Sequence, residues 1–478
     1  MLVSLTLVLV GTSLFVGLLP TITGNYSDQR FLVCAISWAL LCLALGKLVI
    51  RPQQSPRMAH LLWLLPFVLV FLSGELYPAT FRVEPLMFAF FFSGAFLYGS
   101  QLSGLKNFAV VVRQALTLIA LLALIYGLIA VLNYGLALRD GNREVDTTVT
   151  WGFPNIRYWS HLATWLIPLF AIAQQSGSLS KLPLVRALLF LSGAIWWWMI
   201  FTTSARGSAV GLIVGSAVVI ALFRRSSLGW LRVMGKQLLG GGFLWLVLTV
   251  LVPWLVFGSA DLRELRVHSS GRLPLWQEAW EMSLVNFPFG LGPQSWLTHE
   301  TITDAYRLSN PFAHPHNMYL LWAAEYGWVS LAALLIAVFG VCRSLVDVSA
   351  RLNCSDSSDK VIVGLTASVV AAFTHAGVSA VFMAPASMLV GLLVLTLFSA
   401  HLSMTSEFSK GGEIFKLSTQ RLRLSAGLLL VVCCLIGGFW MSEVWHYYEG
   451  NMLDRQTYQG QGAIYSPRFW SHGDFPRQ

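Results

Sequence analysis

The sequence predicts an all-α fold: a polytopic membrane protein of 12 or 13 transmembrane helices with one long external loop that contains short helices. Of the 478 residues, 56% are hydrophobic and only 11% are charged, whereas roughly a quarter of the residues in a soluble domain are charged. Apolar runs near the ~20 residues that a helix needs to cross a bilayer recur along the whole chain. Residues 1–478 are therefore expected to form one integral membrane domain.

Cutting the apolar runs at charges, prolines and glycines predicts 13 candidate spans. They are residues 2–20, 31–49, 59–76, 85–101, 108–135, 158–174, 187–203, 207–223, 237–257, 317–342, 361–382, 387–402 and 424–441. The first run has no basic segment before it and no small-residue cleavage site after it, so we interpret it as a retained helix. Residues 387–402 are the least hydrophobic span, which leaves 12 and 13 spans both open. With 13 spans, the C-terminal tail 442–478 lies outside.

The positions of Lys and Arg predict the orientation, because cytoplasmic loops retain positive charge. With the N-terminus inside, the inside loops hold 18 of the 31 basic residues, including all seven lysines. The outside face then carries 13 arginines and no lysine. Arginine has a planar, permanently charged fork that binds phosphate oxygens in pairs. The bias indicates phosphate binding outside, although pairing with an outside acid is the more ordinary explanation for any single arginine. These acids include Asp140, Glu144, Asp146, Asp261 and Glu264.

The longest outside segment, 258–315, is rich in Trp, Pro, Gly, His and Arg. A loop of this kind over a membrane bundle is where binding and catalytic groups are usually built. The outside segment 136–157 is also long. We therefore expect a functional site on this face.

The most specific feature is the sequence HPHN at 314–317, where the long loop enters an apolar helix. His316 titrates near neutral pH at a membrane interface, so it is a natural general base for a hydroxyl nucleophile. His314 and Asn317 beside it are candidate substrate-binding residues. The ordinary alternative is a histidine that caps or packs against the helix start. Glu325 falls inside the span, where an acid is usually functional or paired: it could orient a ligand, line a cavity or bond to a neighbouring helix.

A tight outside turn between two spans carries Arg206, in the sequence TSARG at 203–207. An arginine in such a turn is held rigidly at the membrane surface, as an anion-binding group should be. The small residues continue with Gly211 and Gly215, and close helix packing explains those two.

Two further outside arginines precede helices. Arg272 opens a segment in which Trp276, Trp280 and Met282 predict an amphipathic helix on the membrane surface. Arg157 stands at an outside helix start, where a snorkelling arginine is about as good an explanation as a functional one. Trp276 is a candidate for stacking on sugar faces, although an interfacial aromatic belt explains most such residues equally well.

Other kinds of site have no support in the sequence. It contains no Walker loop, dinucleotide fingerprint, paired acidic metal motif or HExxH sequence, so neither nucleotide hydrolysis nor a metal site is expected. The six cysteines lack metal-ligand spacing. We interpret His375 and His401 as packing or interfacial residues. The net charge of +9 serves orientation in a membrane protein, so nucleic acid is not expected as a partner.

Together these residues resemble the O-antigen ligase and polymerase superfamily of bacterial envelope glycosyltransferases. The resemblance covers roughly 150–330 and rests on motifs in a fixed order: Ser204 to Gly207, Arg272 to Trp276 with the exit Gly290 to Gly292, and His316, Asn317, Glu325 and Gly327. Two positions depart from the family pattern. Ala205 intervenes where the family more often has Ser-Arg-Gly, and Trp328 to Ser330 follow where a second glycine is common. Neither departure removes a proposed functional group.

The resemblance implies a metal-independent, inverting glycosyltransferase in the bacterial inner membrane, with its active site facing the periplasm and no cofactor. The donor would be a glycan on undecaprenyl diphosphate. Arg206 and Arg272, with Arg157, would hold the diphosphate and stabilise the charge that develops on the leaving group. His316 would accept the proton of the acceptor hydroxyl.

The preferred interpretation is an O-antigen ligase with lipid A-core as acceptor, because the chain has a single long outside loop late in the sequence. A polymerase of the same superfamily, acting on another lipid-linked repeat unit, and a protein oligosaccharyltransferase remain alternatives. A transporter of lipid-linked glycans would place charges along a path through the spans, where Glu325 is nearly the only charge. A structural scaffold would leave the arginine bias unexplained.

Overall fold

The computed structural model describes most of the chain, and the described residues form helices and no strand. These residues are 26–52, 63–77, 83–105, 107–142, 148–153, 156–176, 179–259, 271–309, 312–352, 359–406 and 419–458. The all-α prediction is therefore confirmed for them. The longer helices of the first half are α2 (Tyr26–Ile50), α4 (Leu65–Ser73), α5 (Val83–Leu102), α6 (Phe108–Arg139), α8 (Ile156–Ser176), α9 (Pro183–Thr203), α10 (Arg206–Phe223) and α11 (Leu228–Leu244). Those of the second half are α12 (Val252–Phe257), α13 (Arg272–Val285), α14 (Asp304–Arg307), α15 (Met318–Tyr326), α16 (Trp328–Arg351), α17 (Asp359–Ala376), α18 (Pro385–Ser406) and α19 (Thr419–Tyr458).

Within the described part of the chain, 8 helices are long and apolar enough to cross a membrane. One of these stretches, Arg206–Phe257, contains both α10 and α11, which are separate elements joined by the short turn Arg224–Ser227. Two shorter apolar helices, Leu65–Leu76 and Lys360–Ala376, also coincide with predicted spans. The first predicted span, 2–20, lies outside the described residues. The prediction of a polytopic membrane protein is thus confirmed.

The prediction of one continuous helix over 317–342 is wrong. α15 ends at Tyr326 and α16 begins at Trp328, because Gly327 between them has a φ of 78°. A Cβ atom at Gly327 would collide with the Pro288 carbonyl oxygen, so only glycine fits there. The break leaves α15 as a short helix that packs against α13.

Two helix ends also differ from the prediction. α17 ends at Ala376 instead of continuing to residue 382. The last helix, α19, continues past Ser442 to Tyr458, so the first part of the predicted tail is helical and the remainder lies outside the described residues. Hydropathy marks where a helix leaves the apolar core, and it does not mark where the helical backbone itself ends.

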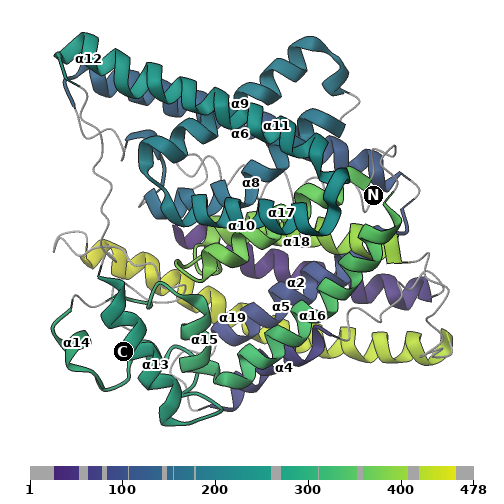
Figure 1. The fold of residues 1–478 in the computed structure, drawn as a ribbon. Coiled ribbons are helices and arrows are strands. Elements are labelled where there is room, and N and C mark those ends of the chain that lie inside the picture. The colour runs from purple at the N-terminus through teal and green to yellow at the C-terminus, as the bar shows by residue number, and fades with distance from the viewer. Residues whose placement is uncertain are drawn as a thin grey trace.

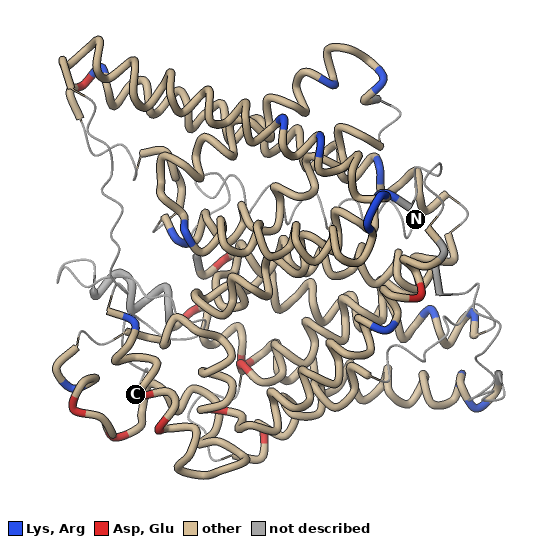
Figure 2. The backbone as a smooth tube through the Cα atoms, in the orientation of Figure 1, with Lys and Arg blue, Asp and Glu red and all other residues tan. Residues whose placement is uncertain are grey.

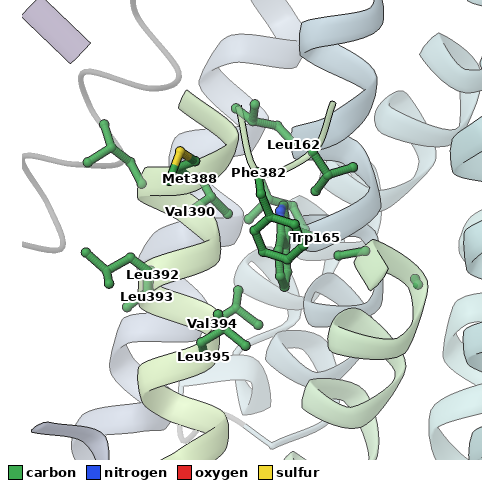
Figure 3. Packing of buried hydrophobic residues seen from close by; sticks show 14 of the residues in the cluster. Leu162, Trp165, Phe382, Met388, Val390, Leu392, Leu393, Val394 and Leu395 are labelled. Atoms are coloured by element: carbon green, nitrogen blue, oxygen red, sulfur yellow. The ribbon is translucent and has the colours of Figure 1, made fainter. Parts of the chain in front are cut away.

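The helix α8 lies at the centre of the bundle, where every residue from Trp159 to Ala173 is buried. It packs against α6, α9, α11, α17 and α18, which surround it in Figure 1. In Figure 3, Trp165 of α8 faces Phe382 in the segment before α18, with ring centroids 6.1 Å apart. The indole N–H of Trp165 also donates to the Ser387 hydroxyl at 3.2 Å. A helix buried over this length holds its first turn, with Arg157, in a fixed place.

Charged residues lie mainly at the two ends of the bundle. In Figure 2, the end at the right of the view is almost purely basic among the described residues. The opposite end carries acidic residues together with arginines, and it is where α13 and α14 lie in Figure 1. This separation follows the distribution of Lys and Arg that the sequence analysis uses for orientation.

Candidate functional site

The predicted tight turn that carries Arg206 is confirmed. α9 ends at Thr203, Ser204 has a left-handed backbone with φ 50°, and Arg206 is the first residue of α10, with its side chain exposed. The hydroxyl of Ser208 donates to the Ser160 carbonyl at 2.7 Å, which ties the turn to α8. The start of α10, which carries Arg206, therefore lies beside the N-terminal part of α8.

The glycines after this turn do what close packing requires. A Cβ atom at Gly211 would lie 2.5 Å from the Ala371 carbonyl oxygen, and one at Gly215 would lie 2.6 Å from that of Ala367. Both neighbours belong to α17, so α10 and α17 touch through their backbones. The packing interpretation of these two glycines is confirmed.

Asn317 provides the cap of α15. Its side-chain oxygen accepts from the backbone N–H groups of Tyr319 at 3.0 Å and Leu320 at 3.1 Å. The cap of this helix is therefore Asn317 and not a histidine, which contradicts the capping half of the ordinary interpretation and leaves its packing half standing. His316 instead adopts a left-handed backbone with φ 55°, and its N–H donates to His314 Nδ1 at 3.1 Å. Both imidazoles are buried, with ring centroids 4.3 Å apart.

The central contact of the site joins Arg157 to His316, with Nη1 and Nε2 3.2 Å apart. A guanidinium group donates hydrogen bonds and accepts none. Nε2 of His316 is therefore the acceptor, which places the proton of the neutral ring on Nδ1. Nδ1 is buried, and no described residue accepts its hydrogen bond. The basic nitrogen of His316 thus faces Arg157.

Two further arginines contribute to the electrostatics of this contact. Burial, reinforced by the positive charges of Arg157 and Arg272, lowers the pKa of His316 from 6.5 to about 3. Burial also lowers the pKa of Arg272, and the nearby charges of Arg157 and Arg206 lower it further. The three guanidinium groups are therefore close enough to repel one another. A cluster of this kind favours a bound anion, which would relieve the repulsion.

The three arginines come from three separate elements. Arg157 is in the first turn of α8, whereas Arg206 and Arg272 are the first residues of α10 and α13. Backbone N–H groups at helix starts also favour anions. Among the described residues, no group of three His, Cys, Asp or Glu side chains is placed to hold a metal ion. The chemistry of the cluster is suited to phosphate groups.

Glu325 lies at the other end of α15 from His316. It is fully buried, and one carboxylate oxygen accepts from the Trp296 backbone N–H at 3.3 Å. The N–H groups of Leu291 and Gly292 donate to the carbonyls of Ala324 and Glu325, at 2.9 and 2.8 Å. The glycine exit of the loop is therefore bonded to the last turn of α15. Glu325 joins the loop to this helix at a distance from the arginine cluster.

Charged side chains are less rare in the bundle than the sequence analysis expects. Besides Glu325, both Arg30 of α2 and Glu84 of α5 are buried. The description of Glu325 as nearly the only buried charge is wrong. Hydropathy could not reveal these two, because each lies near the end of an apolar run.

The predicted amphipathic helix exists as α13, but its faces differ from the prediction. Met282 is fully buried with Leu275, whereas 44% of the Trp280 side chain is exposed. Trp276 is half-buried, and its indole nitrogen has no hydrogen-bond partner among the described residues. The buried face of α13 includes Glu278, which the hydrophobic pattern alone could not assign.

Sequence reasoning missed two residues beside the cluster, His161 and His375. His161 is four residues after Arg157, so both lie on one face of α8. It interacts electrostatically with Arg157 and His316, and His375 interacts with Arg272. The spacing from Arg157 could have indicated His161. No local signal distinguishes His375, which the sequence analysis interprets as a packing residue.

Comparison with known proteins gives one finding. Residues 188–335 match the family model described as O-Antigen ligase, a region that includes Arg206, Arg272 and His316 and leaves Arg157 outside. No curated protein matches the chain. The match overlaps most of the predicted region 150–330, and over these residues it confirms the predicted resemblance to the O-antigen ligase and polymerase superfamily.

Proposed function

We propose that the protein is an O-antigen ligase: an inverting, metal-independent glycosyltransferase that moves a glycan from undecaprenyl diphosphate to a hydroxyl of lipid A-core. The observation that carries this proposal is the contact between Arg157 and His316 inside a cluster of three arginines. The site thus combines groups that bind a diphosphate with a nitrogen base. The glycosyltransferase class follows from the family, and the donor and acceptor are part of the proposal.

The arginines act on the leaving group. As the bond between the sugar C1 and the phosphate oxygen breaks, negative charge grows on the diphosphate. Arg206 and Arg272 stabilise this charge through hydrogen bonds that strengthen in the transition state. In this way the guanidinium groups perform the task that a divalent cation performs in other phosphate-binding enzymes.

The base is masked before the donor binds. Nε2 of His316 accepts a hydrogen bond from Arg157, so it cannot simultaneously accept a proton from an acceptor hydroxyl. The diphosphate is a stronger partner for Arg157 than a neutral imidazole, because its oxygens are charged. Donor binding therefore draws Arg157 away and frees Nε2. The acceptor hydroxyl then gives its proton to Nε2 while its oxygen attacks C1 opposite the diphosphate, and the lipid diphosphate leaves.

The proposed location is the bacterial inner membrane, with the site facing the periplasm. The almost purely basic end of the bundle in Figure 2 supports a cytoplasmic position for that end. The arginine cluster belongs to the first turn of α8 and the starts of α10 and α13, and α13 lies at the opposite end. Both proposed substrates are lipids, and each would reach the site with its chains in the bilayer.

The test is transfer by purified protein in detergent, with a glycan on undecaprenyl diphosphate, lipid A-core and EDTA. Wild type should form glycosylated lipid A-core, and His316→Ala and Arg206→Ala should not. His401→Ala is the matched control, because His401 is a buried histidine of α18 whose imidazole contacts Phe108 and the Leu397 carbonyl. It should retain activity. Chains that lengthen on the carrier, without product on lipid A-core, would replace the ligase with a polymerase.

A further inference from the structure

Two histidines form a buried pair between α8 and α17, next to the arginine turn. His161 of α8 and His375 of α17 are 1% and 3% exposed, and their ring centroids lie 5.1 Å apart at an angle of 72°. Each ring is held by one hydroxyl: His161 Nε2 by Ser379 at 2.7 Å, and His375 Nδ1 by Thr164 at 2.8 Å. The pair is therefore fixed by α8, α17 and the segment that follows α17.

The backbone of the arginine turn lies against His375. A Cβ atom at Gly207 would be 2.5 Å from His375 Nε2 and 2.6 Å from its Cδ2. No side chain fits in this gap, so the peptide that follows Arg206 lies directly against the imidazole ring. The backbone next to Arg206 therefore has the His375 ring as its immediate neighbour.

The second histidine connects this arrangement to the other half of the site. His161 shares a face of α8 with Arg157 and contacts His375 through its ring edge. Both histidines interact electrostatically with the site, His161 with His316 and His375 with Arg272. The pair therefore connects α8, which carries Arg157, to the start of α10, which carries Arg206.

The residue type fits this place. An unperturbed imidazole is largely uncharged at neutral pH, so it adds no full cation to a cluster of guanidinium groups. A carboxylate here would pair with the arginines and compete with the phosphate groups. A neutral planar ring can pack against the turn while its Nδ1 is bonded to Thr164, and it brings no negative charge that would compete with an anion.

We propose that His375, supported by His161, is a positioning residue that sets the place of Arg206 for binding the lipid diphosphate. This inference rests on the proposed function, because it assumes a diphosphate ligand. His375 acts through the arginine turn and needs no contact with the substrate. The proposal thus adds His375 and His161 to a site that otherwise consists of the three arginines and His316.

A double-mutant cycle between His375 and Arg206 tests the inference. Binding of undecaprenyl diphosphate to purified protein is measured for wild type, His375→Ala, Arg206→Ala and the double variant. We expect His375→Ala to weaken binding about tenfold, since misplacing a binding group by about 1 Å has effects of this order or larger. In the Arg206→Ala background, His375→Ala should have no further effect. Losses that multiply in the double variant would overturn the inference.

Controls separate this outcome from loss of fold and from failure of the proposed function. His401→Ala removes another buried histidine, and it should lower the unfolding temperature as His375→Ala does while leaving binding unchanged. Equal loss of binding in both variants would show a general structural effect and overturn the positioning role. If wild type does not bind the lipid diphosphate, or if Arg206→Ala binds as well as wild type, the proposed function fails instead.

A second double-mutant cycle, between Gly207 and His375, tests the contact between the turn and the ring directly. Gly207→Ala should weaken binding about as much as His375→Ala, because the new methyl group pushes the turn away from the ring. In the His375→Ala background the atoms that it meets are gone, so Gly207→Ala should have little further effect. An undiminished loss in that background would mean that the contact between the turn and the ring does not place Arg206.

Discussion

His316 combines burial, a left-handed backbone and a ring nitrogen that faces a guanidinium group. A non-glycine residue in this backbone region is strained by about 1–3 kcal/mol and persists only where its surroundings hold it. The neighbours in sequence supply this support: the His314 ring accepts from the His316 N–H, and the Asn317 cap starts the helix immediately afterwards. The electrostatic environment of the ring comes from Arg157, 159 residues away along the chain.

The first prediction concerns the pH dependence of transfer. In the free enzyme, burial and two positive neighbours lower the pKa of His316 to about 3, so its ring stays neutral as the pH falls from 7 to 5. In the donor complex, Arg157 has moved and the diphosphate adds negative charge, and both changes raise the pKa. In pH profiles measured by initial rates, kcat should therefore fall at a higher pH on the acid side than kcat/KM for the donor does. If kcat and kcat/KM fall at the same pH, Arg157 does not block His316 in the free enzyme.

The second prediction concerns Arg157 itself. Arg157→Gln removes a cation from the diphosphate site, so the KM for the donor should rise by about tenfold, equivalent to about 1.4 kcal/mol. It also removes a positive neighbour of His316, so the pKa of that ring should rise towards 6.5 while burial still holds it below this value. The acid limb of kcat/KM should shift to higher pH. An unchanged limb with a raised KM would mean that Arg157 binds the donor without masking the base.

At the scale of elements, the long loop is attached to the short helix α15 by its backbone. The N–H groups of Leu291 and Gly292 bond to the last turn of α15, and Gly327 allows the chain to pass next to Pro288. The hydroxyl of Ser330 donates to the Gly327 carbonyl at 2.6 Å, which ties the first turn of α16 to this break. These contacts fix the loop against α15, which begins two residues after His316.

The third prediction tests this attachment with two glycine substitutions that should change the free energy of unfolding in opposite directions. Gly327→Ala should destabilise the protein by about 1–3 kcal/mol or more, because φ is 78° and the methyl group meets the Pro288 carbonyl. Gly242→Ala is the matched control, since this helical glycine has nothing within 4 Å of a Cβ atom. It should stabilise the protein slightly, because alanine favours helix. Unfolding in detergent measures both, and equal stability would contradict the role of Gly327.

The fourth prediction concerns Glu278, the buried acid of α13. It accepts hydrogen bonds from the N–H groups of Ile302 and Thr303, at 2.7 and 2.8 Å, and contacts His299 at 2.9 Å. Burial alone would raise the pKa of Glu278, but the bonds from Thr303, Ile302 and His299 hold its pKa below the ordinary 4.5. The stabilisation is therefore present above pH 4.5 and is lost as the pH falls through the lowered pKa.

Glu278→Gln should remove this pH dependence and loosen the segment 295–303 at neutral pH. The expected loss is about 1.5–3 kcal/mol, the contribution of a hydrogen bond to a charged group. Hydrogen exchange of this segment at pH 7 and pH 4 measures the effect. Equal protection in wild type and variant at both pH values would show that Glu278 does not hold the segment.

At the scale of the whole molecule, the basic end and the loop end of the bundle lie on opposite sides. The fifth prediction is that they lie on opposite sides of the membrane. In a background without native cysteines, Ala305→Cys in α14 should react with an impermeant maleimide in intact spheroplasts. Ser226→Cys in the turn Arg224–Ser227 should react only after lysis. The reverse pattern would invert the proposed orientation.

Much of this protein could be predicted from its sequence, because hydropathy and charge are local properties. They indicated the helices and the arginine turn at Arg206, and the motif order indicated the resemblance that the family model supports over residues 188–335. They did not reveal the break at Gly327, since glycine is common in membrane helices and its φ depends on the neighbouring Pro288. The roles of the individual site residues remain predictions until the variants above are measured.

The sequence by itself determined an all-α membrane protein with arginines and a histidine in its loops and at its helix starts. Only the tertiary structure decided that Arg157 meets His316, and that His161 and His375 lie together behind the arginine turn. The physical reason is that these contacts join helices more than 150 residues apart. Side-chain packing between α8, α10 and α17 places them, and no local pattern carries that information.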